Sequence, residues 1–215
     1  MTAGAADPAG AAAGPGRPYG RFPAGRPYGL RRRTVPAGAP WWRIDTDAPD
    51  AWTWGGFAEP RNRFDPASGA WRVRYAARSV AGAGRERYQA TGRYIPADHA
   101  GHRLVRLEAL RRLRVLDLRT EANLDALGVD DRVSTGREAE VWDACHRLAD
   151  AARAWWGHDL DGIVYRSRTT PASSANLLAF FSAAPFRATS TRLGDSTAEL
   201  VELVLDHGFT VGFPF

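Results

Sequence analysis

Alternation of apolar and polar residues predicts a half-buried strand in the first half of the chain. In the stretch "AWRVRYAAR", residues 70–78, the large apolar side chains of Trp71, Val73 and Tyr75 alternate with arginines. This period of two is typical of a strand with one buried face. Further strands or short elements are predicted where apolar residues are dense: "HRLVRLEAL" at 102–110 and "LRVLDLR" at 113–119, joined by a tight connection, the buried run "LDGIVYRS" at 160–167, and "SANLLAFF" at 174–181.

Apolar residues at helical spacing predict the remaining elements. A short helix is expected in "SVAGAGRERYQATGRY", residues 79–94, where the Ser79 hydroxyl can cap the first turn. Glycine after a periodic stretch is a helix stop, and it predicts the ends of two longer helices at Gly157 and Gly208. A helical turn is expected in "NLDALGV", residues 123–129. Strands and helices are mixed without strict alternation, so the pattern favours an α+β fold.

The first 40 residues differ in composition from the rest. They are rich in Ala, Gly and Pro, and they contain the repeat "GRPYG" at 16–20 and again at 25–29. Such a segment buries too little apolar area to offset the entropy lost on ordering. We therefore expect a disordered tail over residues 1–40 and one folded domain over residues 41–215, with a basic arm that touches nucleic acid or a partner as the alternative.

The charge of the chain is concentrated in that tail. All 29 basic residues are arginines, and residues 1–40 hold six of them against one aspartate. Residues 41–215 hold 23 arginines and 23 acids, so the formal charge of +5 describes the tail and does not predict a nucleic-acid surface on the domain. The sequence has no membrane-spanning run or secretory signal, and its one cysteine, Cys145, allows no internal disulfide. We expect a cytoplasmic protein without membrane association.

Five polar residues are candidates for a site because they lie where strands end or helices begin. They are Arg61 and Arg63 in "EPRNRFDP", Tyr75, Glu86 in "GRERY", and Ser167 in "YRSR". Each also has a structural explanation when taken alone, such as an ion pair of Arg63 with a neighbouring aspartate or a solvated helix position for Glu86. The five histidines show no metal-ligand spacing, so we expect no metal.

Taken in order, three stretches of the chain resemble a known family. The segments "RFDPASGAWRVRYAARSVAGAGRERY", "LRVLDLR", and "LDGIVYRSR" followed by "NLLAFF" are similar to the RES domain family, which is named for an Arg, a Glu and a Ser. The resemblance extends over residues 41–213. It implies an ADP-ribosyltransferase-like fold, a mixed sheet with flanking helices. It also implies an enzyme that consumes NAD, often the toxin of a pair with a helix-turn-helix antitoxin, so that nucleic acid is contacted only through that antitoxin.

The same resemblance assigns roles to residues. Arg63 matches the family arginine, Glu86 the glutamate and Ser167 the serine, with Tyr75 as the strand tyrosine. Many family members have a "GGRWN"-like stretch at the arginine, whereas this chain has "EPRNRFDP", so Arg61 competes with Arg63 for the role.

The residue types suit cleavage of the nicotinamide–ribose bond of NAD. Planar guanidinium groups hold phosphate oxygens through paired hydrogen bonds, which suits Arg63, with Arg61 or Arg168, to the pyrophosphate. One ionised carboxylate, Glu86, can stabilise the ribosyl cation because nicotinamide leaves as a neutral group. Tyr75 is then expected to stack on the nicotinamide. Ser167 is expected to hold the ribose or the carboxamide.

Other functions remain open at this stage. Water or phosphate as the acceptor gives hydrolysis or phosphorolysis of NAD, and a protein acceptor gives an ADP-ribosyltransferase. A non-catalytic protein that binds nucleic acid through its basic tail is the alternative from another class.

Overall fold

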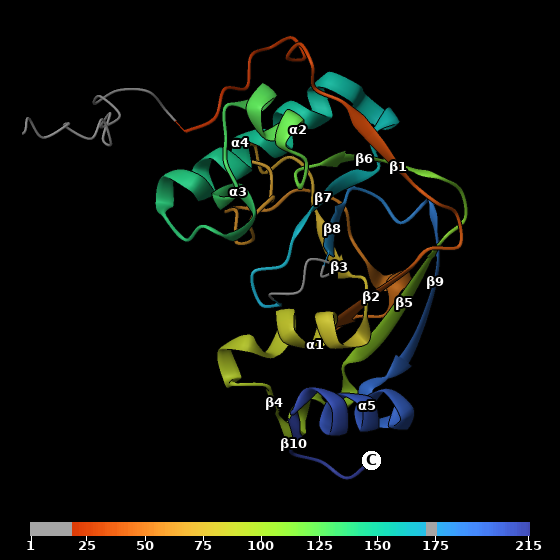
Figure 1. The fold of residues 1–215 in the computed structure, drawn as a ribbon. Coiled ribbons are helices and arrows are strands. Elements are labelled where there is room, and N and C mark those ends of the chain that lie inside the picture. The colour runs from red at the N-terminus through yellow and green to blue at the C-terminus, as the bar shows by residue number, and fades with distance from the viewer. Residues whose placement is uncertain (1–18, 171–175) are drawn as a thin grey trace, which may run out of the picture.

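A computed structural model describes residues 19–170 and 176–215 of the chain (Figure 1). Its strands are β1 Arg32–Val35, β2 Pro40–Asp45, β3 Arg74–Ala77, β4 Tyr94–Ile95, β5 Arg103–Ala109, β6 Leu113–Asp117, β7 Gly162–Arg166, β8 Asn176–Phe180, β9 Phe186–Arg192 and β10 Thr210–Val211. Its α-helices are α1 Val80–Tyr88, α2 Glu121–Leu127, α3 Arg132–Thr135, α4 Ala139–Trp156 and α5 Thr197–His207. Short 3-10 turns occupy Pro49–Ala51, Gln89–Thr91, Ala97–Gly101, Gly157–Asp159 and Leu193–Asp195.

Eight of the strands form one curled, mixed sheet. Their order is β1-β6-β7-β8-β3-β2-β5-β9. Only the pair β6 and β7 is parallel, and its connection carries α2, α3 and α4, as a parallel crossover requires. The other pairs are antiparallel, and β4 and β10 form a separate parallel pair. The expected α+β fold with a mixed sheet and flanking helices is confirmed.

The helices cover the sheet in two groups. In Figure 1, α2, α3 and α4 gather at the top, while α1 and α5 lie at the bottom with β4 and β10. Strand β7 shows how the core is divided: Ile163 and Tyr165 are buried against the α4 side, and Val164 between them is buried in a separate cluster with Trp41 and Phe180. The side-chain period of two thus supplies both faces of the sheet from one continuous apolar run.

Local signals in the sequence predicted the start of α1 and the ends of α4 and α5, whereas the helix expected over residues 79–94 ends earlier, at Tyr88. The Ser79 hydroxyl accepts a hydrogen bond from the backbone N–H of Gly82 at 3.0 Å and caps α1. Gly157 and Gly208 follow the last residues of α4 and α5 with φ of 56° and 65°, a region that favours glycine.

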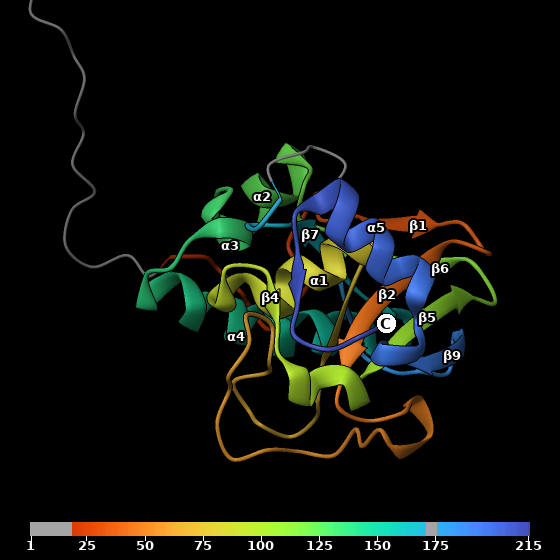
Figure 2. The same ribbon diagram turned by 90° about the horizontal axis from the view of Figure 1, so that it is seen from below.

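Pairing of the strands was not predictable in the same way. Residues 103–109 and 113–117 form strands as expected, but they do not pair with each other: β5 lies between β2 and β9, and β6 lies between β1 and β7. The predicted strand at 70–78 is shorter, because only Arg74–Ala77 joins the sheet and Trp71 makes an isolated bridge to Gly55. In Figure 2 the long orange connection between β2 and β3 loops below the strands, but part of it packs on the sheet, since the ring of Phe64 lies 4.8 Å from that of Tyr165 on β7.

Part of the expected disordered tail is structured. Residues 32–35 form β1, which pairs with β6, and Leu30 is buried. The Tyr19 hydroxyl donates a hydrogen bond to the Asp130 carboxylate at 2.8 Å. The composition of this segment cannot build a core of its own, but the open edge of β6 supplies hydrogen-bond partners and an existing core. Residues 1–18 lie outside the described residues. Within the described ranges, no helix has the length and apolar character needed to span a bilayer.

Candidate active site

A cleft of about 780 Å³ opens beside β3 and α1. It is lined by the segment 57–65, by β2 and β3, by the C-terminal half of α1, and by residues of α3, α4 and the end of β7. All but one of the predicted site residues line it: Arg61, Arg63, Tyr75, Glu86 and Arg168. The remaining one, Ser167, contacts the cleft through Glu86.

Glu86 is held by two hydroxyl groups. Its Oε1 atom accepts hydrogen bonds from Ser167 Oγ at 2.8 Å and from Thr169 Oγ1 at 2.7 Å. The backbone N–H of Thr169 donates to Ser167 Oγ at 3.1 Å, so a tight turn after β7 presents both hydroxyls together. Since no donor among the described residues occupies Oε2, one carboxylate oxygen is oriented by the protein and the other is available to the cleft.

Two glycines let α1 come close enough for this contact. A Cβ atom on Gly82 would lie 2.9 Å from the Cβ atom of Ala77 on β3, and one on Gly84 would lie 3.0 Å from the ring of Phe209. The sequence "GAG" therefore lets α1 pack tightly between β3 and the C-terminal segment. This packing fixes the distance between Glu86 on α1 and the end of β7.

The "YRSR" stretch has a divided role. Tyr165 is buried, and Ser167 is only 9% exposed, whereas Arg166 and Arg168 are exposed. Arg166 forms an ion pair with Asp131 at 3.0 Å. Arg168 lines the cleft and makes no side-chain hydrogen bond or ion pair with the described residues. One residue of the stretch thus orients Glu86 and another is open to a ligand.

Tyr75 braces the loop that carries the arginines. Its hydroxyl donates to Asp65 Oδ1 at 3.0 Å and accepts from the backbone N–H of Phe64 at 2.9 Å. Asp65 Oδ2 accepts from the backbone N–H groups of Arg61 and Asn62 at 2.9 and 2.8 Å. Burial, followed by the nearby Asp65 charge, raises the pKa of Tyr75 well above its usual value. These two hydrogen bonds commit the hydroxyl to the loop, while Tyr75 also lines the cleft.

The Arg63 guanidinium is occupied by hydrogen bonds to backbone carbonyls of the same chain. Its guanidinium donates from Nη1 to the carbonyls of Val133 and Arg132 at 3.2 and 3.4 Å, and from Nη2 to the carbonyl of Gly136 at 2.7 Å. It also lies over the ring of Trp142 at 5.3 Å, and the residue is only 7% exposed. These carbonyls belong to α3 and to Gly136, the residue that follows it, and the Arg132 carbonyl also accepts from the backbone N–H of Gly136 at 2.7 Å. The contacts make Arg63 a brace of α3, and they do not include the ion pair with Asp65.

Arg61 presents the opposite situation. It is exposed, it lines the cleft, and its side chain makes no hydrogen bond or ion pair with the described residues. The backbone of Arg61 is fixed by Asp65, so its position is defined while its guanidinium is open. Of the two arginines that competed in the sequence, Arg61 is the one whose geometry suits a ligand.

Positive charge accumulates in the cleft. Seven arginines line it against three carboxylates. Burial lowers the pKa of Arg168, and repulsion from Arg137 and Arg63 lowers it further, against the attraction of Glu86. Guanidinium groups that repel one another in this way favour an anionic ligand between them. Among the described residues, no group of three or more acidic, histidine or cysteine side chains is placed to hold a metal ion.

Sequence reasoning missed two residues that shape the site. Thr169 supplies the second hydroxyl to Glu86, and its signal was a hydroxyl residue two positions after Ser167, the spacing of a serine turn. Asp65 organises residues 61–65, and its signal was an aspartate before a proline in a polar segment.

The fold and the cleft define an α+β protein with an arginine-lined cleft around one oriented carboxylate. A family model described as the RES domain matches residues 40–201, and the chain belongs to this family. The chain is also similar to a chain of the crystal structure of the M. tuberculosis MbcT–MbcA toxin–antitoxin complex, with a TM-score of 0.48 and 15% sequence identity over 77% of this chain and 90% of that chain. No curated protein matches the sequence.

Proposed function

We propose that this protein is an NAD-consuming enzyme that cleaves the nicotinamide–ribose bond by hydrolysis or phosphorolysis. The observation that carries the proposal is the contact of Glu86 with the hydroxyls of Ser167 and Thr169 at an arginine-lined cleft. Membership of the RES domain family supports it, because the family resemblance implied NAD as the substrate and Glu86 and Ser167 as the site.

Cleavage of the nicotinamide–ribose bond requires a negative charge beside the ribose. When the glycosidic bond breaks, its electron pair stays on the nicotinamide nitrogen, which becomes neutral, and positive charge develops on the ribose. Water or phosphate then adds to the anomeric carbon. A carboxylate that is already oriented stabilises the developing charge without reorganising during the reaction. Glu86 takes this role, with Oε1 held by the protein and Oε2 toward the substrate.

The remaining residues of the cleft bind and position the dinucleotide. Arg61 and Arg168 hold the pyrophosphate, because their guanidinium groups are open and planar donors pair well with phosphate oxygens. The Tyr75 ring provides a surface for the nicotinamide. Ser167 acts through Glu86 instead of on the ribose. Arg63 acts by holding α3 against the cleft.

The family resemblance also implies a cellular role for the enzyme. We infer that the enzyme acts in the cytoplasm as the toxin of a toxin–antitoxin pair and that a helix-turn-helix antitoxin restrains it. Loss of cellular NAD is the physical basis of such toxicity, because the dinucleotide is needed by many reactions.

The test is NAD turnover by a Glu86→Gln variant. The substitution keeps the shape of the side chain and removes its charge, so kcat is expected to fall by about 100-fold to 1000-fold while NAD affinity changes little. Glu59 also lines the cleft and makes no side-chain hydrogen bond with the described residues, so Glu59→Gln is the matched control and is expected to retain activity. Near-normal turnover by a folded Glu86→Gln protein would contradict the assignment.

The products identify the acceptor. Free ADP-ribose indicates water, ADP-ribose 1-phosphate indicates phosphate, and a covalently labelled protein indicates an ADP-ribosyltransferase. The proposed function would be overturned if the wild-type protein left NAD intact with water, phosphate and protein each offered as the acceptor.

A further inference from the structure

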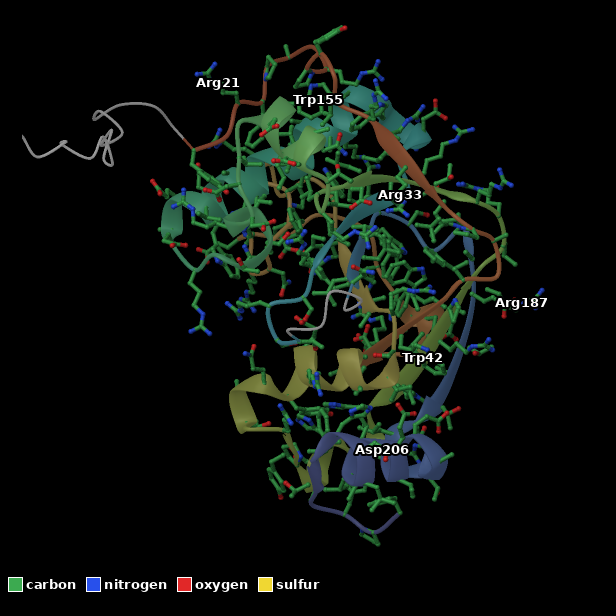
Figure 3. The ribbon with its side chains drawn as sticks, viewed as in Figure 1. Arg21, Arg33, Trp42, Trp155, Arg187 and Asp206 are labelled. Atoms are coloured by element: carbon green, nitrogen blue, oxygen red, sulfur yellow. The ribbon has the colours of Figure 1, made fainter. Side chains whose placement is uncertain are left out.

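Strand β1 forms one edge of the large sheet, away from the cleft. It is the first strand in the sheet order and pairs only with β6 among the described strands. Arg32 and Arg33 are exposed on it, and Arg31 is exposed just before it; Figure 3 labels Arg33 at this edge. The neighbouring strand β6 follows a turn in which Leu110 is 54% exposed and Arg111 and Arg112 are exposed as well. We call this surface the arginine edge, and its members are Arg31, Arg32, Arg33, Leu110, Arg111, Arg112, Arg114 and Arg119.

The arginine edge has more positive charge than its own carboxylates neutralise. Each of two aspartates is shared by two arginines: Asp117 by Arg33 and Arg119, and Asp159 by Arg32 and Arg114. A third carboxylate, Asp161, pairs with Arg111 at 2.7 Å. Arg31 and Arg112 make no side-chain hydrogen bond or ion pair with the described residues, which leaves seven arginines against three aspartates. This excess is local, because residues 41–215 as a whole carry no formal net charge.

Two properties of this surface limit what it can bind. An edge strand presents unpaired backbone N–H and C=O groups, which are a template for another strand. Arginines along the edge repel a second copy of the same strand, since like charges on neighbouring strands are unfavourable. They attract a strand that carries Asp or Glu, because guanidinium and carboxylate form paired, charge-assisted hydrogen bonds. The same residues therefore exclude self-pairing and select an acidic partner.

We propose that the arginine edge binds an acidic, extended protein segment that adds to the sheet as a strand beside β1. No member of this edge lines the candidate active site, so the inference does not depend on the proposed reaction. Nucleic acid fits less well, because its phosphates would leave the backbone N–H and C=O groups of β1 unused.

The experiment measures fluorescence anisotropy of short labelled peptides with the full-length protein. The probe alternates threonine and glutamate, a pattern that forms strands and places its charges on one face. We expect saturable binding that weakens with salt, no binding of the matching threonine–lysine peptide, and roughly fivefold weaker binding to an Arg31→Gln/Arg112→Gln variant. Replacing these two arginines leaves no aspartate unpaired, because neither forms an ion pair with the described residues. The control Arg103→Gln/Arg192→Gln removes the same charge on β5 and β9 and is expected to bind normally.

Two further arms separate the possible outcomes. A threonine–glutamate peptide with N-methylated backbone amides is expected to bind much more weakly, because strand addition uses those amides. Equal binding of the methylated peptide, or equal loss of binding in both double variants, would reduce the contact to general charge attraction and overturn the proposal. Tighter binding of a DNA duplex than of the acidic peptide, with the same dependence on Arg31 and Arg112, would replace it with a nucleic-acid surface. Melting temperatures of the variants confirm that each is folded.

Discussion

The two arginines of "RNR" are expected to respond differently to the same substitution. Arg63→Met retains much of the apolar volume of the side chain but removes the guanidinium that holds α3. Arg61→Met removes a guanidinium that makes no hydrogen bond or ion pair with the described residues. We therefore expect Arg63→Met to act mainly on stability. Arg61→Met is expected to act mainly on NAD binding.

The magnitude follows from the contacts of Arg63. Its bonds to the carbonyls of Val133 at 3.2 Å and Gly136 at 2.7 Å are charge-assisted and contribute about 1.5 kcal/mol each. The contact with Trp142 adds about 0.5–1 kcal/mol. Removing a buried charge regains part of its desolvation cost. The net loss is about 2–4 kcal/mol, which lowers the melting temperature of a protein of this size by roughly 5–15 °C.

The assay pairs thermal melts with initial rates of NAD consumption, measured at a temperature where both variants are folded. Arg63→Met is expected to melt early, with KM for NAD changed less than threefold or so. Arg61→Met is expected to melt with the wild type and to raise KM by about tenfold, the effect of one lost charged hydrogen bond. If Arg63→Met kept the wild-type melting temperature and raised KM instead, Arg63 would be the pyrophosphate ligand and the brace interpretation would be wrong.

Three other changes test the structure. Thr169→Val is expected to lower kcat about fivefold to tenfold with little change in KM, since one of the two hydroxyl donors to the Glu86 carboxylate is lost. Thr169→Ser should restore the rate and Thr170→Val should leave it unchanged, and equal damage by both valines would refute the positioning role. Deleting residues 1–18 is expected to leave the melting temperature unchanged, as their composition suggests. Deleting residues 1–39 removes β1, leaves β2 whole, and should lower the melting temperature by roughly 5–10 °C. Equal melting temperatures of the two deletions would contradict a role for β1. Burial alone would raise the pKa of Asp117, but hydrogen bonds from its arginine neighbours outweigh this and hold it below the usual range. The stability that Asp117 contributes is thus present above its unfolded pKa of about 3.9 and is lost as the pH falls through its lower folded pKa. Asp117→Asn should flatten that part of a curve of unfolding free energy against pH. An unchanged curve would refute the link between Asp117 protonation and stability.

Short-range features of this fold could be predicted because their causes lie within a few residues. Ser79 caps α1 through the amide three positions later, and Gly157 and Gly208 end helices through a backbone conformation that other residues rarely adopt. The α+β class followed from the mixture of such elements. None of these predictions required knowledge of a distant part of the chain.

The candidate site was predictable only through resemblance. Glu86 and Ser167 are separated by 81 positions in the sequence, and nothing in either segment specifies that their side chains meet at 2.8 Å. The family pattern selected them, and the structure brings them together, while their roles in catalysis stay predictions. The pattern left Arg61 and Arg63 open because "EPRNRFDP" departs from the "GGRWN"-like stretch of many family members.

The sequence by itself determined the start of α1, the ends of α4 and α5, several of the apolar runs that became strands, the mixed fold class and the family. Only the tertiary structure decided which strands are neighbours, that residues 32–35 complete the sheet, and that the Arg63 guanidinium is bound to α3 while that of Arg61 is open. The physical reason is the range of the interactions. A cap or a turn is satisfied within its own segment, whereas a sheet edge, a buried guanidinium and an oriented carboxylate are satisfied by groups that only folding brings near.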